Sequence, residues 1–263
     1  MAYKILFLDI DGTILKPDHT FSDITKQAIA SVKKQGVEVF LATGRPLHEI
    51  SELAEELDVH SFIAYNGAFA IHQGKTIVNE PIPLKNIEQF IDIAEKNDHE
   101  LIMYTRDKNY FTSLDRPFIS QFIDIFDLKK NAVFTPDIMD KILGATVLNV
   151  STEKVRLYEI ESNLRLSPVH VNGAEHSYDI LRKNVNKGYS VEQILSLLDI
   201  SRDQAIAFGD GMNDKEMLGA VGEGFAMGNS HEDLFRYAKH RTATVADEGI
   251  AYGLKQLGLF QHA

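Results

Sequence analysis

The first third of the chain alternates between continuous apolar runs and segments of helical periodicity. The runs Ile5–Leu8, Val37–Ala42 and Ser61–Ala64 are typical of strands that are buried on both faces. Between the first two, residues 22–36 place apolar side chains on one helical face, after a serine suited to cap a helix and before a glycine suited to end it. A further helix is predicted to end near Leu57. This alternation predicts an α/β fold with a parallel, doubly wound sheet.

The rhythm changes after a predicted hairpin. Two short strand-like runs flank Gln73-Gly74, and Pro81 and Pro83 then interrupt the pattern. Beyond them, strand pairs interleaved with helices predict an α+β module with a largely antiparallel sheet. Its predicted helices are about a dozen residues from Leu84, Phe118–Phe126 and Lys154–Leu164, and its predicted strands are Leu101–Thr105, Tyr110–Ser113, Ala145–Val150, Val169–Val171 and Tyr178–Leu181.

The first rhythm then resumes and continues to the end of the chain. The predicted elements are a helix at Tyr189–Leu198, a strand at Ala205–Phe208 and a helix from Asp214. We therefore expect one α/β core, formed by residues 1–82 and 184–263, that is interrupted by an inserted α+β domain at 83–183.

Composition and charge restrict the classes of partner. The 263 residues are 44% apolar and 25% charged, which is typical of a soluble globular protein. The formal net charge of −11 argues against nucleic acid or an anionic membrane as a partner. The absence of cysteine excludes disulfides and thiolate metal sites. The first strand begins too early for a signal peptide, and no apolar stretch approaches the roughly 20 residues that span a bilayer. We therefore expect a cytoplasmic protein, whose oligomeric state the sequence does not indicate.

Two carboxylates stand at the end of the first apolar run. Asp9 and Asp11 precede Thr13 in the run Asp-Ile-Asp-Gly-Thr. Acids at the mouth of an apolar strand are costly unless a cation lies beside them, and ligands bind at the carboxyl ends of strands in open parallel sheets. A solvated Asp-Gly turn is the alternative, but the preceding strand favours a metal or phosphoryl-transfer site. There, one carboxylate could attack phosphorus while the other reaches the leaving oxygen.

Two helix starts offer groups that suit a phosphate. After the second strand, the hydroxyl of Thr43 and the N–H of Gly44 stand where a helix is predicted to begin, with Pro46 in its first turn. For this motif alone, a plain N-cap is about equally plausible. Lys187 opens the helix after the inserted segment and could neutralise a phosphate, although a single lysine at a helix start is usually only solvated.

A fourth motif, Gly-Asp-Gly-Met-Asn-Asp, runs from residue 209 to 214. It brings Asp210 and Asp214 to another strand end, with glycines that permit a tight loop. A simple helix-capping loop is the alternative. Oxygen ligands without cysteine or paired histidines favour Mg²⁺ over Zn²⁺, because His170, His176 and His231 lack metal-ligand spacing and are predicted to be surface or satisfied groups.

Taken together, these motifs and the closing stretch Phe225–Asn229 resemble the haloacid dehalogenase-like hydrolases, specifically the Cof-type phosphatases with a large inserted cap. The resemblance covers essentially the whole chain and implies a Rossmann-like core with an α+β cap. It implies that Asp9 attacks phosphorus to form an aspartyl-phosphate. It also implies that Asp11 protonates the leaving alcohol, then activates water, and binds Mg²⁺ through its backbone carbonyl.

The same resemblance implies roles for the other motif residues. Thr43 and Lys187 match phosphate-binding positions, and Asp210 matches a metal-binding acid alongside Asp9. Asn213 resembles a phosphate-contacting asparagine, and Asp214 a residue that supports the metal site without binding the metal itself.

Substrate enclosure is expected to come from the inserted domain. Only about ten residues separate Asp11 from the first predicted helix, which leaves a short flap and no helical cap there. Polar residues at predicted strand ends are candidates to recognise the leaving group of the substrate. One of them, Asp179, stands where the resemblance leads us to expect a glutamate. Asn66-Gly67 resembles an element that borders the site in this family, although a simple turn is nearly as plausible. The candidate readers are Arg106, Asn109, Asn172 and Asp179.

The sequence therefore predicts a Mg²⁺-dependent phosphatase that acts on a small phosphorylated metabolite, such as a sugar phosphate or a cofactor phosphate. A phosphotransferase or phosphomutase that shares the aspartyl-phosphate step is the nearest alternative. A receiver-type phosphoaccepting protein is a more distant one, because receivers lack an acid two residues after the phosphoaccepting aspartate, the position that Asp11 fills.

Overall fold

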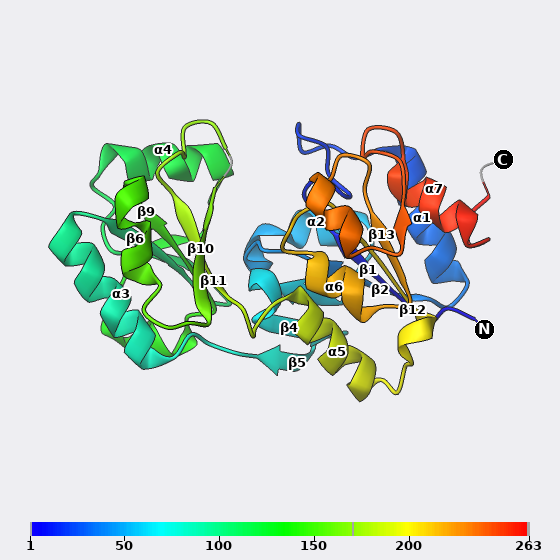
Figure 1. Cartoon of the computed structure of the whole chain (residues 1–263), viewed down its shortest axis with the longest axis horizontal. Helices are drawn as coiled ribbons and strands as arrows, with labels where there is room; N and C mark the ends of the chain where they lie inside the picture. Colours follow the sequence, from blue (N-terminus) through cyan, green and yellow to red (C-terminus); the bar gives the residue numbers. More distant parts are fainter. Residues whose placement is uncertain (1, 170, 262–263) are drawn as a thin grey trace. The chain divides into compact units, whose positions relative to one another are not determined.

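Figure 1 shows a computed structural model of the chain, which describes residues 2–169 and 171–261. The chain folds into two compact units. The first unit consists of Met1–Gly44, Glu52–Val78 and Asn186–Ala263, and the second of Arg45–Ser51 and Asn79–Val185. His170, one of the histidines predicted to have no metal-binding role, lies outside the described residues.

Among the described residues, the first unit is built on an eight-stranded sheet with the order β14-β13-β12-β1-β2-β3-β4-β5. Neighbouring strands from β14 to β3 are parallel, and β4 is antiparallel to β3. The strands are β1 (Ile5–Asp9), β2 (Glu38–Ala42), β3 (Phe62–Ala64), β4 (Phe69–His72), β5 (Lys75–Asn79), β12 (Ala205–Gly209), β13 (Glu223–Ala226) and β14 (His240–Arg241). From β1 the chain adds β2 and β3 on one side of the sheet, and from β12 it adds β13 and β14 on the other side. The direction in which strands are added therefore reverses between the neighbours β1 and β12.

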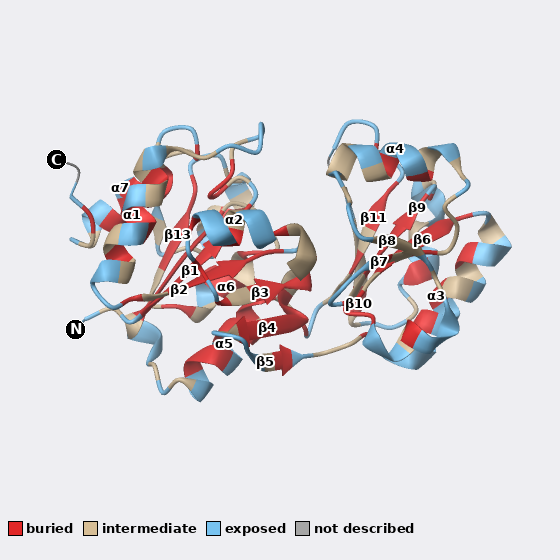
Figure 2. Cartoon of the chain, turned by 180° about the vertical axis from the view of Figure 1, so that it is seen from behind, coloured by how far each residue is buried: buried red, intermediate tan, exposed pale blue. Residues whose placement is uncertain are grey.

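Helices cover both faces of this sheet. Ile5 and Phe7 of β1 belong to an apolar cluster with residues of α5 and α6, whereas the alternate side chains of Leu6 and Leu8 point to the opposite face. Helices α1 and α7 contact each other and contribute nothing to that cluster. Figure 2 shows the central strands as buried. The helices are α1 (Asp23–Lys34), α2 (Ser51–Glu56), α5 (Lys187–Leu197), α6 (Lys215–Ala220) and α7 (Gly249–Gln256). The predicted doubly wound sheet is confirmed.

The second unit is built on a six-stranded sheet, among its described residues, with the order β10-β11-β9-β6-β7-β8. Every pair is antiparallel except β7 with β8. Leu101 and Met103 pack with α3 on one face, and Ile102 packs with α4 on the other. The elements are α3 (Leu84–Asn97), β6 (Glu100–Tyr104), β7 (Asn109–Phe111), α4 (Pro117–Phe126), β8 (Asn131–Val133), β9 (Gly144–Leu148), β10 (Leu164–Pro168) and β11 (Tyr178–Arg182).

Two predictions for the second unit are wrong. The region of the helix predicted at Lys154–Leu164 contains only a short 3₁₀ segment, Thr152–Tyr158. The strand nearest to the one predicted near Val169–Val171 is β10, which ends at Pro168, before the predicted strand begins. The apolar spacing of this stretch fits a helix, but residues 164–168 pair along their whole length with β11. Tertiary pairing therefore places a strand where the predicted helix was to end, from residue 164 on.

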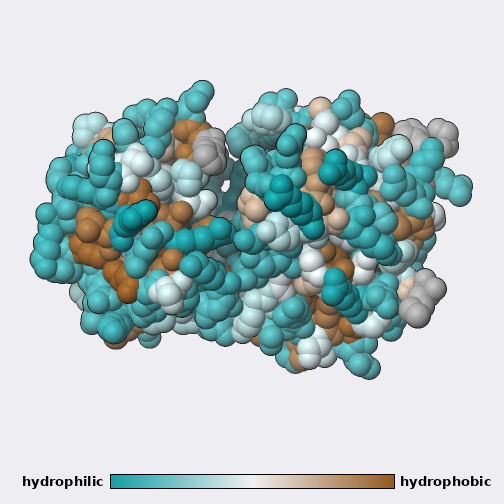
Figure 3. Space-filling view, in the orientation of Figure 1, coloured by the Kyte–Doolittle hydropathy of each residue, from teal (hydrophilic) through white to brown (hydrophobic). Residues whose placement is uncertain are grey.

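No helix in the described part of the chain is long and apolar enough to cross a bilayer. Hydrophilic side chains cover most of the face shown in Figure 3, with hydrophobic areas interspersed on each unit. This distribution is ordinary for a protein surface, on which isolated apolar residues are common.

Candidate active site

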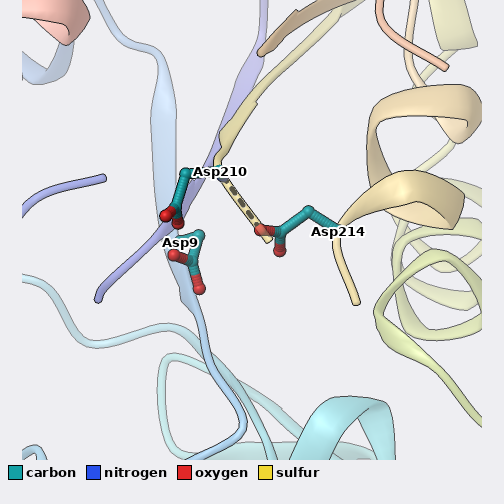
Figure 4. A group of neighbouring side chains, drawn as sticks. All are labelled: Asp9, Asp210 and Asp214. Atoms are coloured by element: carbon teal, nitrogen blue, oxygen red, sulfur yellow. Dashed lines mark hydrogen bonds between the residues drawn. The ribbon is translucent and has the colours of Figure 1, made fainter. Parts of the chain in front are cut away.

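Adjacent strands of the first unit bring the predicted acids together. Asp9 is the last residue of β1, and Asp210 directly follows the neighbouring strand β12. Both stand at the carboxyl edge of the sheet where the strand order reverses, which is where open α/β sheets bind ligands. In Figure 4 the carboxylates of Asp9, Asp210 and Asp214 gather in one place. One oxygen of each lies within 4.8 Å of one oxygen of the others.

A buried lysine joins two of these acids. Lys187 Nζ lies 2.5 Å from Asp9 Oδ1 and 2.6 Å from Asp214 Oδ1. Lys187 and Asp214 are fully buried, and Asp9 is 6% exposed. Asn186 caps α5 by accepting a hydrogen bond from the backbone of Tyr189, which fixes the start of the helix from which the lysine projects. Burial opposes the charge on Lys187, but Asp214 and Asp9 outweigh it and raise the pKa of the lysine.

Asp214 is held by donors on both of its oxygens. Oδ1 accepts from Lys187, and Oδ2 accepts from the backbone N–H groups of Asp210 and Gly211 at 3.1 and 3.0 Å. Asp214 is the N-cap residue of α6, but its side chain makes no capping bond to that helix. Its carboxylate instead closes the loop that carries Asp210. The simple capping loop considered from the sequence is therefore wrong.

Asp210 lies against the turn that follows Asp9. Thr13 Oγ1 donates to Asp210 Oδ1 at 3.4 Å, and Asn229 Nδ2 donates to Oδ2 at 3.3 Å. Gly12 has φ +80°, and a Cβ there would stand 2.2 Å from Asp210 Oδ2. Glycine is thus required at this position both by the backbone conformation and by the approach of the carboxylate.

The structure does not bring the Asp11 carboxylate into the acid cluster. Asp11 is exposed, whereas the intervening Ile10 is fully buried. Backbone N–H groups of residues 13–15 donate to the carbonyl of Ile10, and Gly12 N–H donates to Leu15 O at 2.9 Å. Asp11 therefore sits on a tightly hydrogen-bonded turn beside the cluster, with its side chain at the surface.

The predicted phosphate loop differs in local structure from the expectation. No helix begins at Thr43 or Gly44: the next helical residues are a 3₁₀ turn at Leu47–Glu49, with Pro46 as its N-cap residue. The proposed helix N-terminus at this position is therefore wrong. Thr43 is buried, and its backbone donates to Ile63 O at 2.8 Å.

Asn66 connects this loop to Asn213. Asn213 Nδ2 donates to Asn66 Oδ1 at 2.9 Å, and a Cβ on Gly44 would meet the Asn66 amide at 3.0–3.3 Å. Tyr65 and Asn66 both have positive φ, 53° and 52°, a conformation that is costly for residues other than glycine. Three separate segments thus meet around this amide, beside the acid cluster.

The charges of the site do not balance without a cation. Three carboxylates face one lysine. Burial, followed by the charge of Asp214, raises the pKa of Asp210 to about 6, and the same two causes raise the pKa of Asp9 well above its usual range despite Lys187. Oxygen-only donors suit a hard divalent cation such as Mg²⁺. The residues present therefore fit the metal that the sequence predicts.

The candidate readers of the leaving group lie in different parts of the second unit. Arg106 and Asn172 are exposed in loops. Asn109 is fully buried and donates to Glu49 and Asn131. Asp179 accepts from Thr146 Oγ1 at 2.6 Å, and Thr146 in turn bonds the hydroxyl of Tyr104 at 2.8 Å. Burial raises the pKa of Asp179, while the bond from Thr146 opposes the rise.

Sequence reasoning assigned no role to Thr13 or Asn229, although both contact Asp210. Thr13 lies in the first motif, but the motif alone does not indicate a separate contact for its hydroxyl. Asn229 ends the closing stretch Phe225–Asn229. This stretch follows β13, whose carboxyl end lies at the same edge of the sheet as that of β12, and this placement could have indicated a role for Asn229.

Comparison with known proteins identifies the family. A family model described as haloacid dehalogenase-like hydrolase matches residues 6–254. The chain belongs to the haloacid dehalogenase-like hydrolases.

Members of this family similar to the chain match it along nearly their whole length. The protein named "Putative phosphatase YkrA" of Bacillus subtilis is 32% identical over 99% of this chain and 100% of its own. The 5-amino-6-(5-phospho-D-ribitylamino)uracil phosphatase YitU of the same bacterium is 30% identical over 96% of each chain. The crystal structure of a hypothetical protein from Geobacillus kaustophilus superimposes with a TM-score of 0.89 and 31% identity, over 98% of this chain and 100% of that one. The predicted family, fold class and phosphatase class are thereby confirmed.

Replacing Lys187 by methionine is expected to lower the free energy of unfolding by about 3–5 kcal/mol in metal-free buffer at pH 7.5, because two buried carboxylates lose their cation. The loss should shrink at pH 5.5. Acids whose pKa is raised in the folded state bind protons more readily there than in the unfolded chain, so their protonation on acidification favours the folded state. Urea unfolding at the two pH values measures both effects.

Lys26→Met is the matched control, since Lys26 pairs with Glu56 at the surface, with side chains 44% and 54% exposed. Surface pairs are worth about 0–1 kcal/mol. Equal losses in the two variants would contradict the role of Lys187 in balancing the buried acids.

Proposed function

We propose that this phosphatase is Mg²⁺-dependent and hydrolyses a small phosphorylated metabolite through an aspartyl-phosphate on Asp9. The observation that carries the proposal is the buried pairing of Lys187 with Asp9 and Asp214 inside a carboxylate cluster at the reversal of strand order. In this arrangement Lys187 opposes the rise in the pKa of Asp9 and fixes its carboxylate where an incoming phosphate would meet positive charge.

In the first step, a carboxylate oxygen of Asp9 attacks phosphorus as the bond to the leaving oxygen breaks. Asp11 donates its proton to that oxygen, which leaves as an alcohol. The exposed position of Asp11 on a rigid turn suits this task, because the carboxyl group can exchange protons with solvent and reach outward toward the ester.

In the second step, Asp11, now a carboxylate, takes a proton from a water molecule. The oxygen of that water attacks phosphorus, and the bond between phosphorus and Asp9 breaks. Inorganic phosphate leaves, and both carboxyl groups return to their starting protonation states. Splitting the displacement in two is effective because an acyl phosphate is far easier to hydrolyse than a phosphate monoester.

Mg²⁺ would be held by side-chain oxygens of Asp9 and Asp210 and by the backbone carbonyl of Asp11. Asp214 would not bind the ion but would hold Lys187 and the loop that carries Asp210. Both Asp214 oxygens already accept hydrogen bonds, which supports its assignment to a supporting role. The ion supplies charge neutralisation for the phosphoryl oxygens.

The phosphate would be bound by Lys187, by the hydroxyl of Thr43 and the N–H of Gly44, and by the amide of Asn213. The contact between Asn213 and Asn66, together with the approach of Asn66 to Gly44, supports this group as one phosphate-binding surface. All its members belong to the first unit.

We further propose that residues 1–82 and 184–263 form the catalytic core and that 83–183 form a cap that sets substrate specificity. YitU, one of the similar proteins, is named for a phosphate ester of a ribitylamino pyrimidine. Sugar phosphates and cofactor phosphates are therefore the substrate classes we favour, and a cytoplasmic location would give access to them.

A phosphotransferase or phosphomutase would use the same first step but pass the phosphoryl group to another alcohol. Product analysis separates these outcomes, because only a hydrolase returns free phosphate. A receiver-type signalling protein is disfavoured by Asp11 and by the similarity to phosphatases.

Phosphate release from a panel of phosphorylated metabolites is the direct test. We expect release by the wild-type protein with Mg²⁺ and none with chelator. Asp9→Asn removes the nucleophile and should lower kcat by about 10⁴-fold or more. Full activity in Asp9→Asn, or indifference to the chelator, would overturn the mechanism.

Asp11→Asn should lower kcat by about 10²–10⁴-fold, which is the usual contribution of general acid–base catalysis. Substrate binding should persist because the Asp9–Lys187–Asp214 group is intact. Rapid-quench kinetics and equilibrium binding of a slow substrate measure the two effects. Unchanged turnover would rule out the acid–base role.

Asp179→Asn is expected to change selectivity between substrates. If Asp179 accepts hydrogen bonds from hydroxyl groups of the leaving alcohol, the substitution should lower kcat/KM for sugar phosphates by about 10–100-fold, as expected for bonds to a charged acceptor. Nitrophenyl phosphate, which offers no hydroxyl groups, should be affected much less. A uniform change across substrates would indicate that Asp179 has no part in specificity.

A further inference from the structure

Asn229 belongs to none of the groups that the proposed mechanism uses, yet its side chain makes three hydrogen bonds within the first unit. Nδ2 donates to Gly12 O at 2.9 Å and to Asp210 Oδ2 at 3.3 Å. Oδ1 accepts from the backbone N–H of Val245 at 2.9 Å. The side chain thus connects three segments that are distant in sequence.

These three partners leave only one orientation for the amide. Gly12 O and Asp210 Oδ2 can only accept, at neutral pH, and the N–H of Val245 can only donate. A flipped amide would place an oxygen against two acceptors and an NH₂ group against a donor. Both amide hydrogens of Asn229 are therefore directed at the turn and at the carboxylate.

The bond to Gly12 completes the fixation of the turn that carries Asp11. Gly12 N–H donates to Leu15 O, and because a trans peptide is planar, this bond also sets the direction of the Asp11 carbonyl. The bond from Asn229 fixes the carbonyl on the other side of Gly12. Both peptide groups that flank this glycine are thereby held.

The bond to Asp210 orients a carboxylate without neutralising it. Thr13 and Asn229 each donate to one oxygen of Asp210, and both are uncharged. Each carboxylate oxygen keeps a further lone pair for a cation. The same amide thus sets the spacing between the Asp11–Gly12 turn and the Asp210 carboxylate.

We propose that Asn229 is a positioning residue that holds the Asp210 carboxylate and the Asp11–Gly12 turn in the geometry that a divalent cation requires. This inference rests on the proposed function, in which Asp210 and the Asp11 carbonyl bind Mg²⁺. Residues that orient metal ligands typically change metal affinity or activity by about 10–100-fold when removed.

The test compares full-length wild-type protein with Asn229→Ala and with the neighbouring control Ser230→Ala. The Ser230 hydroxyl is buried and has no hydrogen-bond partner among the described residues. Metal-stripped proteins are titrated with Mg²⁺ alone in a calorimeter, and thermal unfolding is recorded with and without Mg²⁺. We expect Asn229→Ala to raise the Kd for Mg²⁺ at least tenfold and to shrink the Mg²⁺-induced rise in Tm. Ser230→Ala should match the wild type.

A second variant separates positioning from anchoring. Asn229→Asp keeps the acceptor for Val245 and the size of the side chain, but replaces both donated hydrogen bonds by repulsion between acceptors. We expect kcat to fall at least tenfold at saturating Mg²⁺, with KM changed less than about threefold. A purely structural role would instead lower the metal-free Tm and leave these constants unchanged.

Two results distinguish failure of this inference from failure of the proposed function. A wild-type protein that neither binds Mg²⁺ nor releases phosphate would remove the proposed function. A wild-type protein that does both, alongside a folded Asn229→Ala variant with an unchanged Kd for Mg²⁺ or an Asn229→Asp variant with unchanged kcat, would overturn the role of Asn229 alone.

Discussion

The first unit depends on one ammonium group that lies between two carboxylates. Lys187 pairs with Asp9, which is 178 residues away, and with Asp214, which is 27 residues away. Because all three groups are buried, none can be solvated if a partner is removed. The pairing therefore links the first strand of the sheet to the helix and loop that follow the second unit in sequence. It forms only when both segments are in their folded positions. Nearby backbone N–H groups complete the arrangement by satisfying the remaining oxygen of Asp214.

That pairing leaves the site with surplus negative charge, which is a poor solution for stability alone. A core optimised only for folding would replace the buried ions with apolar side chains of similar volume, which is often neutral or stabilising. The raised pKa values of Asp9 and Asp210 express the same cost in terms of proton affinity. Active sites retain such costs because a preorganised charge distribution acts on the transition state without reorganisation. The surplus charge is thus an expected feature of a site that meets a cation and a phosphate together.

The sequence predicted those parts of the site that follow from strand order. Asp9 and Asp210 end apolar runs, and neighbouring parallel strands deliver their ends to one edge, so their meeting was predictable. The local structure after Thr43 was not predictable in this way. Residues 47–49 adopt a 3₁₀ turn and group with the second unit because of tertiary contacts such as that of Asn109 with Glu49. The end of the helix predicted at 154–164 was wrong for a similar reason, since residues 164–168 form a strand that pairs with β11. The boundaries of the inserted domain stay a prediction.

The sequence indicated no role for Asn229, and the chemistry of a neutral amide explains why. Asn229 orients Asp210, and Asn66 orients Asn213, through hydrogen bonds that add no net charge. A lysine at either position would pair with the acids and compete with a divalent cation for them, whereas an amide can fix geometry and preserve the negative potential of the site. Carboxylates and lysines at strand ends stand out in a sequence because burying them is costly. An asparagine after a strand is equally typical of an ordinary turn, so only the three-dimensional contacts distinguish the two.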